Sequence, residues 1–309
     1  EPVELLQELL AGRYRIDREL GRGGFATVYQ VWNLRLQRAE ALKVLSPRHR
    51  SDETFYRRFT QEIQLAASLE HPSITKVHDF GETGGACWYT MQLVIGETLK
   101  AALRARGPLP ERELAAIAVP LLDALEYSHA RGIVHRDIKP ENVILDRAGH
   151  PFLMDFGIAK SAASTVKTQA GFLVGTPSYV APEQALGRPI NGRADLYALG
   201  VTLFRAASGR LPFEAGDPLR ALILRLTDPP RPLSEVREGV DPAFASIVMR
   251  ALERSPSRRW ESARAMREAF EAWLAGRPLE ATGTGDRGPE AIREATDSDE
   301  LLPDATVLG

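Results

Sequence analysis

The sequence predicts an α+β fold of two lobes: a small lobe with an antiparallel β-sheet and one helix, and a larger, mostly helical lobe. Two observations predict it. The first ninety-odd residues contain five short segments rich in β-branched and aromatic residues. From about residue 99 onwards, apolar residues recur instead at helical spacing. With 309 residues, of which 44% are hydrophobic, the chain is long enough for two lobes.

The small lobe comes first. Its strand-like segments are YRIDREL, TVYQVWNL, AEALKVL, ITKVHDF and ACWYTMQLV. Between the third and the fourth, residues 52–69 predict one helix that ends before Pro72. Its expected apolar stripe consists of Phe55, Phe59, Ile63, Leu65 and Ala66.

The large lobe follows. The segment ERELAAIAVPLLDALEYSHARG carries an apolar stripe, and two short strands are expected on either side of the turn DRAGH. Further helices are predicted in ADLYALGVTLFRAASG, PLRALILRL, DPAFASIVMRALE and ESARAMREAFEAWLAG. After Gly276 the chain is rich in Gly, Pro, Thr and acids, which predicts a disordered tail.

The composition argues against several partners. Lys and Arg total 39 against 41 Asp and Glu, a formal net charge of -2, so we expect no nucleic-acid partner and only local anion sites. The single cysteine, Cys87, fits a reducing compartment, and no apolar run reaches the roughly 18 residues of a membrane helix. We therefore expect a cytoplasmic domain, although the parent protein could be membrane-anchored.

Two features of the small lobe point to phosphate chemistry. Glycines in LGRGGFATVY permit a turn whose backbone N–H groups approach phosphate oxygens, with an ordinary hairpin turn as the alternative. In AEALKVL, Lys43 stands inside an apolar strand. A buried ammonium needs an anionic partner, and Glu62 on the predicted helix is a candidate, unless Lys43 faces solvent from a half-exposed strand.

Charged residues gather in two segments of the large lobe, VHRDIKPENVIL and FLMDFGIAK. Asp155 follows an apolar strand, and with Asn142 it offers the hard oxygen ligands that Mg²⁺ accepts beside phosphate oxygens. Asp137 can accept a proton from a hydroxyl nucleophile, and Lys139 can neutralise the transferred phosphoryl group. The two segments therefore predict a phosphoryl-transfer site.

Taken together and in order, GRGGFATV, ALKVL, HRDIKPEN, DFG and APE resemble the signature of serine/threonine protein kinases, close to the eukaryotic-like kinases of bacteria, over about residues 12–275. The resemblance implies the bilobal protein-kinase fold. It divides the chain into an N-terminal extension (1–11), a small lobe (12–94), a large lobe (95–276) and a disordered acidic tail (277–309).

The resemblance also implies an activity: transfer of the γ-phosphate of ATP to threonine or serine hydroxyls of proteins, in signalling, with Mg²⁺ or Mn²⁺. Lys43 would bind the α- and β-phosphates and pair with Glu62, Asp137 would be the base beside Lys139, and Asn142 and Asp155 would bind the metal. The family's third loop glycine is Ala26 here, a mild change. The residues implied to bind ATP are Leu20, Gly21, Gly23, Gly24, Val28, Ala41, Lys43, Met91, Gln92, Val94 and Ile144.

Within that set, MQLVIGETL is similar to the hinge between the lobes. Met91 would be the gatekeeper, and the backbone of Gln92 and Val94 would face adenine. Val28, Ala41 and Ile144 would enclose the ring, although apolar residues of this kind are also ordinary core residues.

The segment GTPSYVAPE concerns the substrate class, because in protein kinases it forms the shelf for the residue after the phosphoacceptor. By resemblance, Glu183 pairs with Arg259. Thr176 together with Lys139 resembles the serine/threonine pattern, and Ile158 after DFG accompanies a preference for threonine.

Regulation is expected in the segment 158–174, which carries Ser161, Ser164, Thr165 and Thr168. Arg136 can pair with a phosphate, so we predict autophosphorylation at Thr168 first and Thr165 second; the alternative is ordinary loop hydroxyls. Threonines of the tail are candidate docking sites for phosphothreonine-binding partners, or plain linker residues. By resemblance the small lobe offers a homodimer surface.

Two other functions are weighed. A pseudokinase would bind partners without turnover, but it usually lacks the lysine or one of the two aspartates, and all three are present. An enzyme that phosphorylates a small molecule shares a related fold, and GTPSYVAPE argues against it.

Overall fold

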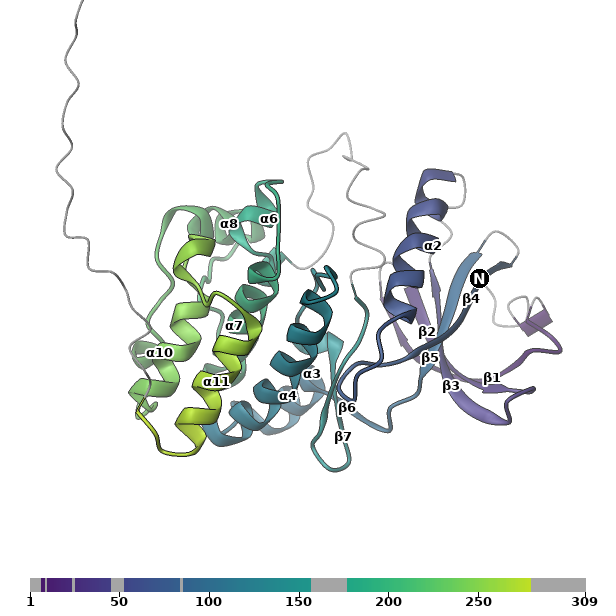
Figure 1. Ribbon diagram of the computed structural model, residues 1–309, viewed down its shortest axis with the longest axis horizontal. Coiled ribbons are helices and arrows are strands. Elements are labelled where there is room, and N and C mark those ends of the chain that lie inside the picture. Colours follow the sequence, from purple (N-terminus) through teal and green to yellow (C-terminus); the bar gives the residue numbers. More distant parts are fainter. Residues whose placement is uncertain are drawn as a thin grey trace, which may run out of the picture. The chain divides into compact units, whose positions relative to one another are not determined.

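The structure, a computed structural model, describes residues 7–8, 10–23, 26–45, 53–83, 86–156 and 177–278. All of them belong to one unit of the chain, Glu1–Leu279. Within this unit the chain forms a β-rich part, then a helical part, as Figure 1 shows in purple to blue and in teal to yellow. The predicted α+β class with an antiparallel small-lobe sheet is confirmed.

The small lobe is a five-stranded antiparallel sheet in the order β1-β2-β3-β5-β4. Each predicted strand segment supplies one strand, although β4 begins three residues later than ITKVHDF does. The bounds are β1 (Tyr14–Arg22), β2 (Ala26–Asn33), β3 (Arg38–Leu45), β4 (Val77–Thr83) and β5 (Ala86–Gln92).

Helix α2 (Glu53–Ala67) is the one long helix described in this lobe, and it lies beside the sheet in Figure 1. Phe59, Ile63 and Ala66 follow helical spacing and are buried. Leu65 is 48% exposed, so its expected place in the apolar stripe is wrong. It stands about 200° around the helix from Ile63 and therefore points away from the sheet.

The two faces of the sheet have different roles. Gly21, Val28, Lys43 and Tyr89 are successive cross-strand partners and form one row on one face. Neighbouring positions along the strands point to the opposite face, where a separate core forms. That core consists of Leu10, Tyr14, Tyr29, Val31, Leu42 and Trp88. The row of Lys43 lies on the other face, where Tyr89 shares the main core with Phe59 and Ile63 of α2.

The large lobe begins with a three-stranded sheet in the order β6-β7-β8, formed by Gly96–Thr98, Val143–Asp146 and Pro151–Leu153. The two strands expected around DRAGH are β7 and β8. Strand β6 was not predicted, because three residues carry no periodicity. It lies so close to β7 that a Cβ on Gly96 would stand 1.9 Å from the carbonyl oxygen of Leu145, which only glycine avoids.

Helix α7 (Arg193–Ser208) is the centre of the large lobe: its residues from Ala194 to Phe204 are all buried. It packs against α4 (Glu111–His129) and α10 (Pro242–Ala251), and α11 (Ala263–Leu274) packs against α4. The other helices are α3 (Leu99–Arg106), α6 (Pro182–Ala185), α8 (Pro218–Thr227) and α9 (Leu233–Val236), with short 3₁₀ turns η2 (Pro140–Asn142), η3 (Pro177–Tyr179) and η4 (Pro256–Arg258).

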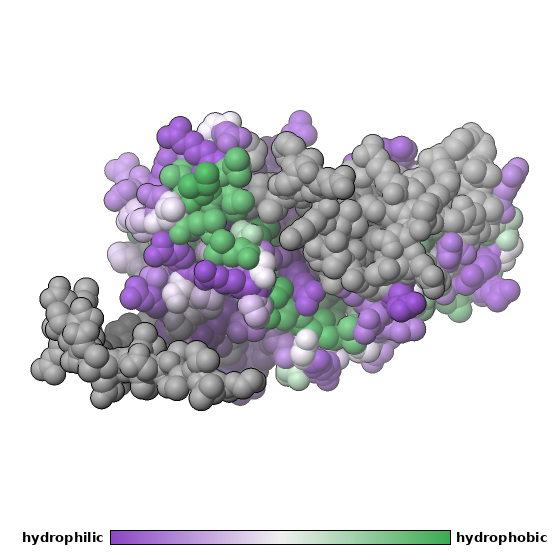
Figure 2. All heavy atoms as spheres, turned by 90° about the horizontal axis from the view of Figure 1, so that it is seen from above, coloured by the Kyte–Doolittle hydropathy of each residue, from purple (hydrophilic) through white to green (hydrophobic). Residues whose placement is uncertain are grey.

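Apolar side chains reach the surface around α6 and α8. Leu186, Leu219 and Ile223 are 48%, 63% and 50% exposed. Figure 2 looks from above and shows apolar atoms gathered over the part of the large lobe where these helices lie. An apolar surface of this kind is typical of contacts with other macromolecules.

None of the helices in the described ranges is long and apolar enough to cross a membrane.

Candidate active site

The segment that carries Asp137 is fixed by a buried carboxylate. Asp195, in the first turn of α7 and 1% exposed, accepts the backbone N–H groups of His135 and Arg136, both at 2.8 Å. His129 Nε2 lies 2.8 Å from the same carboxylate. Arg136 has a left-handed backbone, φ 67°, which costs a non-glycine residue about 1 kcal/mol or more. The bonds to Asp195 hold the chain in this unusual conformation.

The ring of His135 continues the support. It is fully buried, and burial lowers its pKa, so the imidazole is neutral. Its Nε2 donates to the carbonyl oxygen of Met154 at 2.8 Å, and its Nδ1 accepts the N–H of Asp137 at 3.2 Å. One side chain thus joins the Asp137 segment to the residue before Asp155.

Two of the predicted site residues, Lys139 and Asn142, contact a third, Asp137. Its Oδ2 accepts from Lys139 Nζ at 2.9 Å and from Asn142 Nδ2 at 3.0 Å. Asn142 Nδ2 also donates to the carbonyl oxygen of Asp137 at 2.7 Å. The amide nitrogen of Asn142 is therefore engaged in two hydrogen bonds, which turns its carbonyl oxygen, Oδ1, away from Asp137.

Two side chains of the small lobe contact Asp155, one at each of its carboxylate oxygens. Lys43 Nζ lies 2.6 Å from Oδ2, and the Tyr89 hydroxyl donates to Oδ1 at 2.7 Å. Burial alone would raise the pKa of Asp155, but the charge and hydrogen bond of Lys43 and the hydrogen bond of Tyr89 lower it below its ordinary value. Asp155 is consequently a carboxylate, the form that binds a divalent cation. It too has a left-handed backbone, φ 59°.

The anion that reaches Lys43 is a different one from the predicted Glu62. Lys43 is mostly buried and needs an anion, and Asp155 supplies it across the lobes. Glu62 lies on α2, the helix predicted to carry it. Among the described residues, however, Lys43 forms its ion pair with Asp155 of the large lobe.

The oxygen donors suit magnesium. The N–H of Met154 donates to the backbone carbonyl of Asn142 at 2.9 Å, which puts Asp155 and Asn142 on adjoining segments. Across the described ranges, no cluster of three or more His, Cys, Asp or Glu side chains could bind a metal by itself. A cation held by one carboxylate and one amide oxygen would complete its shell with phosphate oxygens and water, as Mg²⁺ does.

Four of the predicted nucleotide residues share the Lys43 face of the small-lobe sheet: Gly21, Val28, Ala41 and Met91. Val28 and Lys43 are cross-strand partners, and Ala41 pairs with Met91 two residues along. A Cβ added to Gly21 would meet no described atom within 4 Å. Leu20 is 39% exposed, and Gly24 lies outside the described residues.

The hinge residues follow β5. Gln92 donates its N–H to the carbonyl of Lys76 at 2.8 Å, whereas no hydrogen bond within the described part of the chain reaches the backbone of Val94. Ile144, half-buried on β7, comes from the large lobe.

The shelf segment is held by arginines. Glu183 and Arg259 form the expected pair, with two bonds of 2.7 Å. Arg225 of α8 donates to the carbonyls of Ser178 and Val180 at 2.8 and 3.0 Å, which fixes the backbone within and just after η3. Thr176, the other residue of this prediction, lies outside the described residues.

The predicted phosphorylation segment, with Ser161, Ser164, Thr165 and Thr168, also lies outside the described residues, as does Ile158. Arg136, which is predicted to pair with the phosphate of that segment, is among the described residues. Arg136 Nε is buried and has no hydrogen-bond partner among the described residues, and Gln184 donates to the backbone carbonyl of Arg136 at 3.1 Å.

Sequence reasoning missed Asp195, His135 and Tyr89. An acidic residue inside the apolar segment ADLYALG was the available signal for Asp195. For Tyr89 the signal is its pairing with Lys43, which depends on strand register and cannot be read from composition.

Asp195 gives a first prediction. Replacing it by asparagine removes one carboxylate oxygen acceptor and the negative charge beside His129. We expect the free energy of unfolding to fall by about 1–3 kcal/mol, and kcat to fall roughly tenfold as the Asp137 segment loosens. Urea unfolding and initial rates measure the two effects. Asp217→Asn, a change at an exposed helix cap, is the control for the charge; equal effects of both would contradict the anchoring role.

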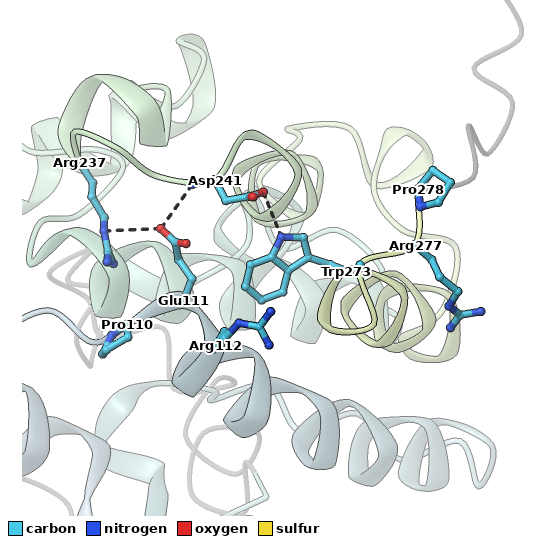
Figure 3. Close-up of a pocket in the computed structure, with 9 residues that line it drawn as sticks. Pro110, Glu111, Arg112, Arg237, Asp241, Trp273, Arg277 and Pro278 are labelled. Atoms are coloured by element: carbon cyan, nitrogen blue, oxygen red, sulfur yellow. Dashed lines mark hydrogen bonds and ion pairs between the residues drawn. The ribbon is translucent and has the colours of Figure 1, made fainter.

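A separate hollow lies in the large lobe, between the start of α4 and the end of α11 (Figure 3). Its polar groups bind one another: Trp273 Nε1 donates to Asp241 Oδ1 at 3.0 Å, and Arg237 pairs with Glu111 at 3.8 Å. None of the predicted site residues lines it, so it is not the phosphoryl-transfer site.

The chain is similar to known proteins over most of its length. Residues 14–271 match the family described as "Protein kinase domain". A probable serine/threonine-protein kinase of Streptomyces coelicolor is 41% identical over 280 residues, which is 88% of this chain and 42% of that protein. The serine/threonine-protein kinase PknB of Mycobacterium leprae is 36% identical over 94% of this chain and 46% of its own length. The chain thus spans less than half of these two relatives.

Among solved structures, a crystal structure of the PknI kinase domain of Mycobacterium tuberculosis has a TM-score of 0.68 and 35% identity. The match covers 84% of this chain and 96% of that one.

Proposed function

This chain belongs to the protein kinase family, and on that premise we propose that it transfers the γ-phosphate of ATP to threonine and serine hydroxyls of proteins. One observation carries the proposal. Lys43 from the small lobe contacts Asp155, and the Met154 carbonyl beside Asp155 is bonded to His135, which in turn bonds Asp137. Residues from separate sequence motifs therefore meet in one place.

The geometry supports a role for each residue. The carboxylate of Asp137 is oriented by hydrogen bonds from Lys139 and Asn142. It would accept the proton of the attacking hydroxyl while the hydroxyl oxygen bonds to phosphorus and the bond between phosphorus and ADP breaks. Lys139, 2.9 Å from Asp137, would neutralise charge on the transferred group. Lys43 would bind the α- and β-phosphates. Mg²⁺ or Mn²⁺, held by Asn142 and Asp155, would supply positive charge beside the phosphate oxygens.

The shelf supports a protein as the acceptor. Residues 177–183 are fixed by Arg225 and Arg259, and the surface beside them on α6 and α8 is apolar. A small-molecule acceptor needs neither a fixed segment at 177–183 nor an apolar surface beside it. The test is incubation of the purified chain with γ-labelled ATP, Mg²⁺ and a generic basic protein. We expect label on threonine and serine; turnover of ATP onto a metabolite with no labelled protein would contradict the proposal.

Autophosphorylation is a further prediction. A phosphate at Thr168, or secondly Thr165, would meet Arg136, whose buried Nε has no described hydrogen-bond partner. We expect roughly tenfold activation, since hydrogen bonds between charged groups are worth about 1.5–3 kcal/mol. Mass spectrometry after incubation with ATP maps the sites, and Thr168→Ala should abolish most of the gain, while Thr227→Ala on α8 should not. An unmodified segment 157–176 in active enzyme would overturn this prediction.

We further propose that the domain works in the cytoplasm, where ATP and Mg²⁺ are supplied. A homodimer through the small lobe stays a prediction from the family resemblance, and phosphothreonine-binding partners stay a prediction from the threonines of the tail.

A further inference from the structure

Tyr89 stands in an unusual relation to the predicted metal ligand. It comes from β5, is 2% exposed, and its hydroxyl donates to Asp155 Oδ1 at 2.7 Å. Its cross-strand partner Lys43 binds the other oxygen, Oδ2, at 2.6 Å. Two adjacent positions of one sheet therefore bind one carboxylate, one through a charge and the other through a neutral hydroxyl.

Two described side chains contact the ring of Tyr89. Phe59 of α2 packs on it with the ring centroids 6.3 Å apart, and Lys43 Nζ lies 5.8 Å from its centroid. A tyrosine has two side-chain torsions, so a buried ring aims its hydroxyl with little freedom. Burial also raises the pKa of Tyr89 well above its ordinary value, and the group is a neutral donor at physiological pH.

The two bonds to Asp155 differ in what happens when a nucleotide binds. In the proposed function Lys43 binds the phosphates, so its bond to Asp155 is exchanged for one to the nucleotide. The bond from Tyr89 need not break. Each oxygen of an ionised carboxylate has two lone pairs, so Oδ1 can accept from the hydroxyl while the carboxylate also binds a cation.

Asp155 needs such support. Its backbone lies in the left-handed region, φ 59°, which a non-glycine residue adopts only where its surroundings hold it. Tyr89 is the described side chain that binds Asp155 without also being expected to bind phosphate.

We propose that Tyr89 is a positioning residue for the divalent cation: its hydroxyl holds the Asp155 carboxylate in place when Lys43 turns to the nucleotide. This inference rests on the proposed function. It predicts that the small-lobe sheet contributes to metal affinity through a residue outside the motif segments of the sequence.

Tyr89→Phe removes the hydroxyl and keeps the ring. Mg²⁺ is expected to tighten the binding of fluorescent ADP, and the Mg²⁺ concentration that gives half of this effect is the quantity to measure. We expect this concentration to rise about tenfold, which corresponds to the loss of a hydrogen bond to a charged group. ADP affinity in EDTA should stay unchanged. The value of kcat should fall at low Mg²⁺ and recover at high Mg²⁺, which a merely structural defect would not do.

The matched control is Tyr14→Phe. Tyr14 is equally buried and its hydroxyl donates to Asp79 at 2.9 Å, but on the opposite face of the same sheet. Its loss should leave the Mg²⁺ dependence unchanged. A Tyr89→Phe protein with the wild-type Mg²⁺ dependence, or with a tighter one, overturns the inference. A wild-type chain whose ADP binding ignores Mg²⁺ overturns instead the proposed function.

Discussion

Replacing Asp137 by asparagine is expected to lower kcat by about 10² to 10⁴-fold, the usual contribution of a general base. The amide has nearly the same size and can still contact Lys139 and Asn142, but it cannot accept the proton of the attacking hydroxyl. In the proposed function Lys43 and the small lobe bind the nucleotide, so the affinity for ADP should change little. Initial rates at saturating ATP and calorimetric ADP binding measure both quantities.

A matched control is Asp123→Asn on α4. Asp123 pairs with His71 and is 51% exposed, so this variant makes the same chemical change away from the site. It should keep wild-type kcat. Phosphoryl transfer by Asp137→Asn at the wild-type rate would remove Asp137 from the role of base.

The second large effect concerns stability. Arg259→Met is expected to lower the free energy of unfolding by about 3–5 kcal/mol, because it leaves a buried carboxylate without its partner. The side chain of Arg259 is fully buried, and that of Glu183 is 8% exposed. Arg259 also donates to the backbone carbonyls of Glu253, Arg193 and Arg254, so these acceptors lose a donor too. Denaturant unfolding measures the change.

A second substitution of Arg259 should have a smaller effect on the free energy of unfolding. Arg259→Lys keeps the charge but not the planar fork that binds both oxygens of Glu183, so it should lie between methionine and wild type. The control is Arg106→Met, which breaks an exposed pair with Glu113 and should cost no more than about 1 kcal/mol. If Arg259→Met were as stable as that control, the pair would not hold the shelf.

Local periodicity was enough to predict the two lobes, because apolar alternation indicates strands and helical spacing indicates helices. The pair of Glu183 with Arg259 was predicted only from the resemblance to protein kinases, and the structure contains it. The partner of Lys43 could not be predicted in this way. Whether its ammonium meets Glu62 or Asp155 depends on how α2 and the segment after β8 approach β3, and Asp155 reaches it in this structure.

The other missed residues have the same cause. Tyr89 and Asp195 act through neighbours 66 and 60 residues away in the chain. Leu65 was misplaced for a smaller reason, since it lies two residues from Ile63 and thus on the far side of the helix. Side chains whose role is to hold another residue leave little local signal in sequence.

We expect Lys43, Asn142 and Asp155 to converge on one nucleotide and its cation, with Asp137 beside the transferred group. A crystal structure of the chain with a non-hydrolysable ATP analogue and Mn²⁺, located by its anomalous signal, tests it most directly. We predict Mn²⁺ bound by oxygens of Asp155 and Asn142, with Lys43 moved from Asp155 to the phosphates. Mn²⁺ bound elsewhere, or a nucleotide bound while Lys43 stays on Asp155, would contradict the account.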